Sequence, residues 1–164
     1  MEIFQVVTMF NIISFSLDKF DTKAFGYENL YEFDKIKNGI VTVKNASETG
    51  NYKNKKILIL LESYDFDANT EGAIKLIGEK KKACFLIDFS RIINSYGVNR
   101  AILLSKIRTF LKLCVKYNVF YAFADFAKDE YEIRSSQELA HIALLLGLNI
   151  GQAKFALKML KHYL

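Results

Sequence analysis

Two nearly continuous apolar runs, separated by one long helical pattern, constrain the fold of this chain more than any other feature. The runs are ACFLID at residues 83–88 and VFYAFA at 119–124, and the helical pattern lies at 99–117. A strand with one face in water alternates apolar and polar residues, whereas a strand covered on both faces is apolar throughout. A strand, a helix and a second strand in this order form a parallel crossover unit. The unit therefore predicts an α/β fold with a parallel sheet.

The remaining strands and helices are predicted from the same two kinds of pattern, apolar runs for strands and helical spacing for helices. Short apolar runs rich in β-branched and aromatic residues predict strands at 3–9, 28–33, 40–44, 57–62, 83–89 and 119–126. Helical spacing predicts helices near 69–80, 99–117, 135–147 and 150–163. The alternation of strands and helices fits either an open sheet or a barrel, but six strands are fewer than the eight that a closed TIM barrel needs. The length of 164 residues predicts a single domain over 1–164, with the polar stretch at 45–56 as its clearest loop.

The uncharged segment at 3–17 raises the question of a membrane span. It is shorter than the roughly 20 residues that a spanning helix needs, and it lacks the basic start of a signal peptide. A buried strand explains it better, and we expect a cytoplasmic protein that makes no membrane contact. Cys84 and Cys114 fall in apolar runs, which predicts reduced core thiols rather than a disulfide.

The net charge of +5 is confined to the C-terminal half of the chain. Acids and bases cancel in residues 1–82, whereas residues 83–164 hold eleven bases and six acids. No acid occurs between Asp88 and Asp125, although six bases do. Such asymmetry is typical of a protein with a polyanionic partner, while the alternative is a soluble protein that is simply basic.

The predicted helix at 99–117 separates its charges from its apolar residues. The apolar residues form one stripe at helical spacing: Leu103, Ile107, Phe110, Cys114 and Tyr117. Arg108, Lys112 and Lys116 stack four residues apart on the other side. A solvent-facing helix usually mixes charge signs, so this row is interpreted as a phosphate-binding face that nothing nearby neutralises. In the predicted last helix, Lys154 and Lys158 repeat the pattern.

Basic residues also surround the start of the predicted helix at 135–147. Ser135 and Glu138 fit a capping box, which accounts for the serine but not for Arg134 just before it. Free backbone N–H groups and the helix dipole favour an anion at this point. We therefore expect Lys128 and Arg134 to hold an anion. The alternative is a salt bridge to one of the neighbouring acids, Asp129, Glu130 and Glu132.

The usual catalytic and metal-binding patterns are missing from the sequence. It contains no HExxH, no paired CxxC, no GxGxxG and no GxxxxGK. His141 and His162 lack partner ligands for a metal centre, and no Ser–His–Asp arrangement is supported. Asp125 is near the end of a predicted strand, where it lies at the ligand-bearing rim of an α/β fold or caps the following loop. We predict no catalytic residue, no metal site and no cofactor bound by this chain.

Four segments of the second half resemble the archaeal ribonuclease P protein component 3 family, whose eukaryotic relative is the thirty-kilodalton ribonuclease P subunit. They are FLIDFSRII at 85–93, NRAILLSKIRTFLKLCVKYNV at 99–119, AKDEYEIRSSQELA at 127–140 and ALLLGLNIGQAKFAL at 143–157. The third segment is the most specific. In it Ser136 stands where the family has proline, and Asp125 and Phe126 stand where a Ser–Gly pair commonly precedes it. The resemblance implies a TIM-barrel-like (PHP-like) α/β fold with a shortened N-terminal part.

The resemblance also implies a function. This chain would be a protein subunit of ribonuclease P, the ribonucleoprotein that removes the 5′ leader from precursor tRNA. The RNA would perform the hydrolysis with its own metal ions, while this chain and ribonuclease P protein component 2 brace it beside other ribonuclease P proteins. This chain would contact precursor tRNA only indirectly. The residues expected to contact RNA or a protein partner are Arg91, Arg100, Lys106, Arg108, Lys112, Lys116, Lys128, Arg134, Lys154 and Lys158.

Two rival interpretations come from the same residues. The segment at 135–163 can be scanned as a helix–turn–helix, which would make the protein a DNA-binding regulator. Against it, the second helix has no cluster of Arg, Asn or Gln beyond Gln152 to contact base edges. A metal-dependent phosphoesterase on a related barrel would need ligands that the sequence lacks.

Overall fold

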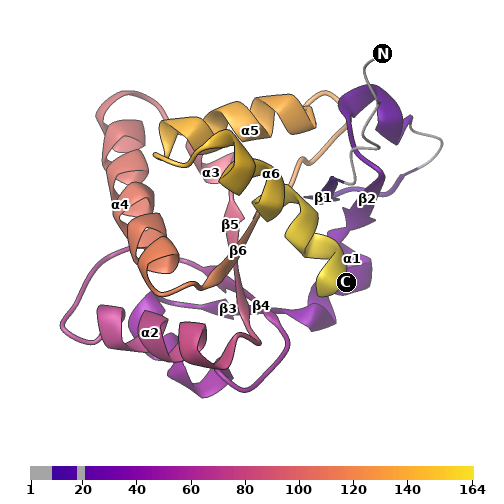
Figure 1. Cartoon of the computed structure of the whole chain (residues 1–164). Helices are drawn as coiled ribbons and strands as arrows, with labels where there is room; N and C mark the ends of the chain where they lie inside the picture. Colours follow the sequence, from indigo (N-terminus) through magenta and orange to yellow (C-terminus); the bar gives the residue numbers. More distant parts are fainter. Residues whose placement is uncertain (1–8, 18–20) are drawn as a thin grey trace, which may run out of the picture.

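The computed structural model describes residues 9–17 and 21–164, in which strands and helices follow one another along the chain (Figure 1). The strands are β1 (Phe10–Ile13), β2 (Asn29–Glu32), β3 (Ile40–Val43), β4 (Leu58–Leu61), β5 (Cys84–Asp88) and β6 (Phe120–Ala124). The helices are α1 (Phe33–Ile36), α2 (Thr70–Lys80), α3 (Ser90–Ile93), α4 (Gly97–Lys116), α5 (Ser136–Leu145) and α6 (Ile150–Met159). Short 3-10 helices are η1 (Thr22–Phe25), η2 (Lys37–Gly39), η3 (Ala46–Tyr52) and η4 (Leu160–His162).

The predicted elements from residue 28 onward are confirmed, with ends that differ by a few residues. The strand predicted at 3–9 falls almost wholly outside the described residues, and β1 begins only at Phe10. The predicted loop at 45–56 contains η3, which packs against α2. The short helices α1 and α3 were not predicted, because four residues are too few to show a helical period.

All ladders between the strands are parallel, which confirms the predicted α/β class. β3, β4, β5 and β6 form one sheet in that order, and β1 pairs with β2 in a second sheet. The two sheets meet where β1 lies beside the residues after β6. There the N–H of Ser14 donates to the carbonyl of Ala127 (2.7 Å), and the N–H of Phe126 donates to that of Ile12 (3.0 Å). No ladder joins β2 to β3 in the described part of the chain, so a closed barrel is not shown and the TIM-barrel-like (PHP-like) fold that the resemblance implies is not confirmed.

Strands β4, β5 and β6 of the four-stranded sheet are covered on both faces, which explains their continuous apolar runs, whereas the edge strand β3 exposes Thr42. One face packs against α2, α4, α5 and α6 in the larger core cluster. Phe110 of α4 lies there against Phe85 of β5, with ring centroids 4.9 Å apart, and against Tyr64 at 5.3 Å. The other face forms a smaller cluster with β1 and η4. Cys84 and Cys114 are buried in different clusters as free thiols, as predicted.

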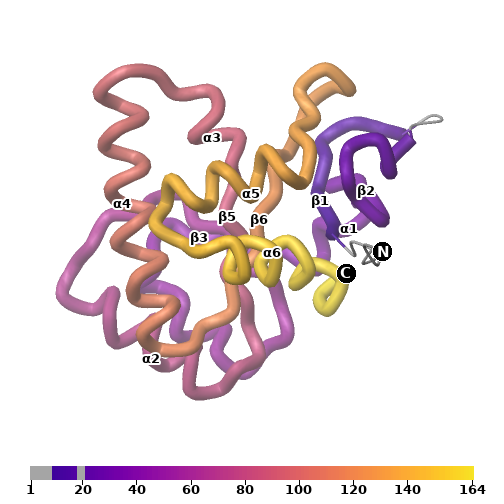
Figure 2. Tube along the Cα trace, turned by 45° about the horizontal axis from the view of Figure 1, so that its top comes forward, coloured from indigo at the N-terminus to yellow at the C-terminus, as the bar shows by residue number. Residues whose placement is uncertain are grey.

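The last residues of the sequence pack near β2 and β3, the two neighbouring strands that no ladder joins in the described residues. Tyr163 and Leu164 join the smaller cluster together with Phe33, Ile36 and Ile40, which flank the β2–β3 connection. The Tyr163 hydroxyl donates to the carbonyl of Lys82 (2.9 Å), which holds this segment near the amino end of β5. Figures 1 and 2 both place the end of the chain beside α1. None of the helices in the described ranges is long and apolar enough to cross a membrane.

A close backbone approach positions α2 against the connection from α4 to β6. A Cβ atom on Gly78 would overlap the carbonyl oxygen of Tyr117 and would lie only 3.0 Å from Val119 Cγ2. Glycine is therefore the residue that fits between this helix and the backbone beneath it.

Candidate nucleic-acid interface

The basic row on α4 faces solvent, as its helical spacing predicts. Arg108, Lys112 and Lys116 are exposed, and the buried residues of α4 lie on its other side. Two of the three side chains nevertheless have partners. Lys116 Nζ lies 2.8 Å from Glu71 Oε1, and the Arg108 guanidinium donates to the carbonyl of Leu145 at the end of α5. The prediction that nothing nearby neutralises the row is therefore wrong for Lys116.

The pairing of Lys116 was missed because its partner comes from another helix, 45 residues earlier. The same Glu71 carboxylate accepts from the Tyr117 hydroxyl (2.5 Å), and these two hydrogen bonds hold the pKa of Glu71 below its usual value. Both ends of the ion pair are more than half exposed, so it contributes little to stability. Lys112 makes no ion pair with any residue that the structure describes, and it remains an available charge on this face.

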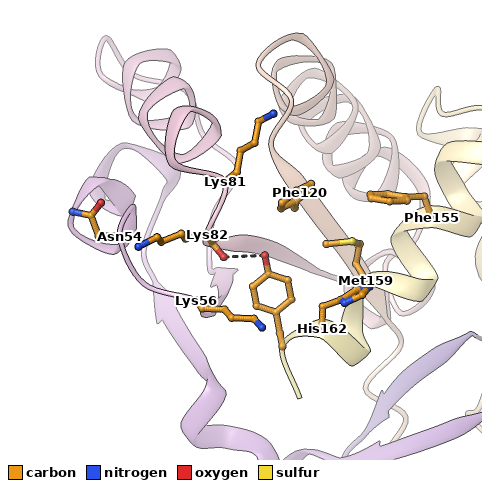
Figure 3. A pocket seen from close by; sticks show the side chains of 9 residues that line it. Asn54, Lys56, Lys81, Lys82, Phe120, Phe155, Met159 and His162 are labelled. Atoms are coloured by element: carbon orange, nitrogen blue, oxygen red, sulfur yellow. Dashed lines mark hydrogen bonds between the residues drawn. The ribbon is translucent and has the colours of Figure 1, made fainter.

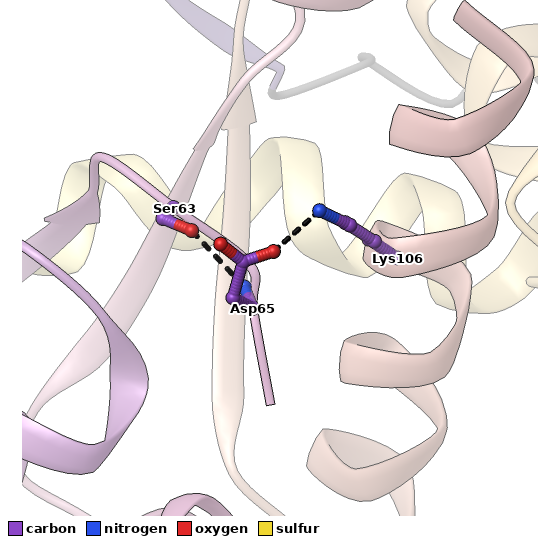
Figure 4. A network of polar contacts seen from close by, with 3 residues as sticks. All are labelled: Ser63, Asp65 and Lys106. Atoms are coloured by element: carbon purple, nitrogen blue, oxygen red, sulfur yellow. Dashed lines mark hydrogen bonds and ion pairs between the residues drawn. The ribbon is translucent and has the colours of Figure 1, made fainter. Parts of the chain in front are cut away.

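Lys106 is also paired, at the start of the same exposed face. Its ammonium group contacts Asp65 in the segment after β4, where the Ser63 hydroxyl accepts from the Asp65 N–H (Figure 4). The hydrogen bond from Lys106 is the main reason that the pKa of Asp65 lies below its usual value. An exposed pair of this kind opens readily, so it reduces the charge available to a partner without removing it.

Arg91 and Arg100 are used within the fold. The Arg91 guanidinium donates to the carbonyl of Leu61 (3.1 Å) and lies over the Tyr64 ring. Arg100 donates to the carbonyls of Ile92 (3.1 Å) and Ile93 (3.0 Å), which end α3. Carbonyls at the end of a helix or strand lack partners of their own, so both arginines have a structural role.

The start of α5 has the predicted capping box. Ser135 Oγ accepts from the N–H of Glu138 (3.1 Å), and the Glu138 carboxylate accepts from the N–H of Ser135 (2.7 Å). The side chains of Lys128 and Arg134 make no ion pair among the described residues. Glu132 instead accepts from the backbone N–H of Lys128 (2.9 Å). The salt-bridge alternative is thus not found, and anion binding by Lys128 and Arg134 stays a prediction.

Asp125 caps the loop that leads to this helix. Its carboxylate accepts from the N–H groups of Ala127 (3.1 Å) and Arg134 (2.8 Å), and only 2% of the residue is exposed. Its own N–H donates to the side-chain oxygen of the buried Asn11 (3.0 Å). Burial raises the pKa of the Asp125 carboxyl, and it does the same for Asp88 on β5. Of the two roles considered for Asp125, the hydrogen bonds favour loop capping.

The carboxyl ends of β5 and β6 enclose little space. A cavity of about 40 Å³ lies there between Ser90, Asn94, Asp125 and Arg134. Ligands of α/β proteins usually bind at this edge of the sheet, yet the space is too small for a nucleotide. Within residues 9–17 and 21–164, no three His, Cys, Asp or Glu side chains gather into a metal-binding group.

A larger pocket opens at the opposite edge, at the amino ends of β4, β5 and β6 (Figure 3). Its volume is about 580 Å³, and lysines and aromatic rings line it. One wall is α6, on which Lys154 and Lys158 are exposed without an ion pair in the described residues. The lining residues come from four separate parts of the sequence, and no local pattern marks any of them. Sequence reasoning therefore missed this pocket.

The parallel strands and the helices that cover one face of the sheet define an α/β protein. No protein-family model matches the sequence, and no curated protein matches it either. Among solved structures, the chain is similar to a chain in the cryo-EM structure of archaeal ribonuclease P with mature tRNA. The TM-score is 0.60, with 14% sequence identity, and the alignment covers 93% of this chain and 80% of that one. At this identity the likeness shows a shared fold.

Proposed function

We propose that this chain is a protein subunit of ribonuclease P, the ribonucleoprotein that removes the 5′ leader from precursor tRNA, and that it belongs to the component 3 family. The observation that carries the proposal is the fold shared with a chain of archaeal ribonuclease P over 93% of this sequence. The AK…RSS segment at 127–136, which resembles component 3 in its sequence, supports the same assignment independently of the fold.

The strand order supports a TIM-barrel-like (PHP-like) origin for the fold. Among the described strands, β1 lies beside the residues that follow β6, as in a barrel, and β3 to β6 follow one another in sequence order. The interruption falls between β2 and β3, where Tyr163 and Leu164 pack nearby.

In this proposal the chain braces the catalytic RNA in the cytoplasm and has no chemistry of its own. The RNA would hold the metal ions, and ribonuclease P protein component 2 would bind beside this subunit. Exposed cations without an ion pair in the described residues are the best candidates for RNA contacts: Lys112, Lys128, Lys154 and Lys158. Their positive charge releases counterions from phosphates, which makes RNA binding dependent on salt.

Reconstitution tests the proposal directly. Ribonuclease P RNA and component 2 from the source organism are assayed for 5′ leader removal from precursor tRNA, with and without this chain. We expect the chain to raise the rate at limiting magnesium, where RNA folding needs the most support. An unchanged rate at every magnesium concentration, together with no binding to the RNA, contradicts the proposal.

Capture from native cells separates this function from the helix–turn–helix alternative. A tagged chain is purified and the nucleic acid bound to it is sequenced. We expect a structured RNA with further ribonuclease P proteins, whereas fragments of duplex DNA favour the regulator. In the structure, α6 buries Ala153, Ala156 and Leu157 and packs against β6 and β1, which leaves few side chains for contacting bases.

A further inference from the structure

The pocket at the amino ends of β4, β5 and β6 has the size of a small-molecule site. Its volume of about 580 Å³ lies inside the range of about 300–1,000 Å³ that such sites occupy. The segment before β4 supplies Lys56, the segment before β5 supplies Lys81 and Lys82, and α6 with η4 forms the facing wall (Figure 3).

Two phenylalanine rings line one side of this pocket. The ring centroids of Phe120 and Phe155 are 6.4 Å apart, and Met159 lies beside them in Figure 3. Phe155 is 48% exposed, so half of its apolar surface meets water in the absence of a ligand. The planes of the two rings are tilted by 45° to each other. A base can therefore stack face to face on the half-exposed Phe155 ring while its edge meets Phe120, because every base has a π-face that stacks on an aromatic side chain.

The other side of the pocket is positively charged. Lys56, Lys81 and Lys82 line it, and none of the described lining residues is acidic. None of the three lysines forms an ion pair with another described residue. The Tyr163 hydroxyl is already bonded to the Lys82 carbonyl, which holds the wall in place without using the ammonium group. Unpaired lysine ammonium groups bind phosphates as point charges.

We propose that this pocket binds one unpaired nucleotide of a single-stranded RNA segment. Its base stacks on Phe155 with its edge against Phe120, and its flanking phosphates lie on Lys56, Lys81 and Lys82. The proposal rests on the proposed function and deepens it by naming a binding site for single-stranded RNA.

The surface around the pocket favours a strand over a free mononucleotide. Lys154 and Lys158 are exposed on α6 on either side of Phe155 in sequence, so the positive surface continues beyond the pocket. A strand that leaves the pocket would meet these charges, whereas a mononucleotide would not reach them. A duplex hides the faces of its bases in the stack, so only an unpaired nucleotide can enter.

Fluorescence anisotropy with a labelled penta-adenylate RNA tests the proposal on the whole chain. Phe155→Ala should weaken binding about 5- to 150-fold, the range that follows from alanine substitution at a stacking site. The matched control is Phe66→Ala, because Phe66 is 43% exposed and does not line the pocket. Binding by this control should stay within about twofold of the original chain. Equal affinity for the Phe155→Ala and Phe66→Ala variants overturns the proposal.

The salt dependence of the same binding gives a second readout that does not rely on one aromatic residue. Lys82→Ala should reduce the slope of log affinity against log salt by about 0.7, the value for one phosphate of a single strand. Lys44→Ala is the control, because this exposed lysine follows β3 at the opposite edge of the sheet. An unchanged slope for Lys82→Ala contradicts phosphate binding in the pocket.

Two competitors test the form of the ligand. Unlabelled adenosine monophosphate should compete at least tenfold more weakly than the pentamer, and a hairpin without unpaired bases should compete more weakly still. A mononucleotide that binds as tightly as the pentamer overturns the strand proposal. If the original chain stimulates leader removal but the Phe155 variant binds the pentamer normally, the pocket proposal alone fails. If the pentamer binds as expected but leader removal is not stimulated, the proposed function alone fails.

Discussion

Replacing Gly78 with alanine tests the close approach between α2 and the connection from α4 to β6. An alanine in a helix normally gains about 1 kcal/mol over glycine. Here the added Cβ would overlap the Tyr117 carbonyl oxygen and would lie 3.3 Å from its carbonyl carbon. These are backbone atoms that cannot rotate away, so the overpacking cost of about 1–3 kcal/mol should be near its upper end. We expect a net loss of about 2 kcal/mol in the free energy of unfolding.

Urea denaturation measures this loss as a lower midpoint with an unchanged slope. In a chain of this size, about 2 kcal/mol corresponds to a fall in Tm of about 4–8 °C. Gly72→Ala is the matched control, because Gly72 lies in the same helix with no atom within 4 Å of its added Cβ. The control should gain about 0.5–1 kcal/mol. Stabilisation by Gly78→Ala of the same size would refute the packing argument.

Three further predictions concern the core, the buried carboxyl group and the basic face. Phe110→Ala should lower the free energy of unfolding by about 3–5 kcal/mol in urea denaturation, whereas Ile102→Ala, at an exposed position of α4, should change it little. Burial raises the pKa of Asp125, so the folded state binds its proton more tightly, and the stability that this contributes at low pH is lost as pH rises through the raised pKa. Between pH 3 and 7 the urea midpoint of Asp125→Asn, relative to that of the original chain, should therefore increase as pH rises. Midpoints of the two chains that change in parallel with pH would contradict this. Lys112→Ala should lower the salt slope of ribonuclease P RNA binding by about one, and Lys106→Ala, which removes a cation paired with Asp65, by less. Equal salt slopes for the two variants would contradict the view that the ion pair with Asp65 reduces the contribution of Lys106 to RNA binding.

The sequence predicted those parts of the fold that depend on neighbouring residues. Strands β4 to β6 were found because each is a short apolar run whose residues are largely buried, and β3 was found because its residues IVTV are β-branched. The capping box of Ser135 and Glu138 was found because its two partners are three residues apart. The direction in which the α4 cations point follows from helical spacing and was also predicted correctly.

The features that were missed depend on contacts between distant residues. Glu71 pairs with Lys116 from another helix, and Asp65 pairs with Lys106 across 41 residues. Arg91 and Arg100 were assigned to a basic surface from the sequence. In the structure they donate hydrogen bonds to backbone carbonyls that only the fold brings within reach. The large pocket assembles residues that surround three different strands and the end of the chain. No single segment contains enough of it to form a motif.

The contact between β1 and the end of β6 has a consequence for the chain during its synthesis. The backbone N–H of Asp125 donates a hydrogen bond to the side-chain oxygen of Asn11, 114 residues earlier in the sequence. At roughly 5–20 residues per second, the ribosome needs about 6–23 s to supply the second partner after the first. Throughout that interval one edge of the nascent β1 strand has no neighbour, and an unpaired edge invites pairing with other chains. The edge of β1 that lies beside residues 125–127 must therefore wait for the last quarter of the sequence before its hydrogen bonds can form, whereas β3 can pair with β4 much earlier.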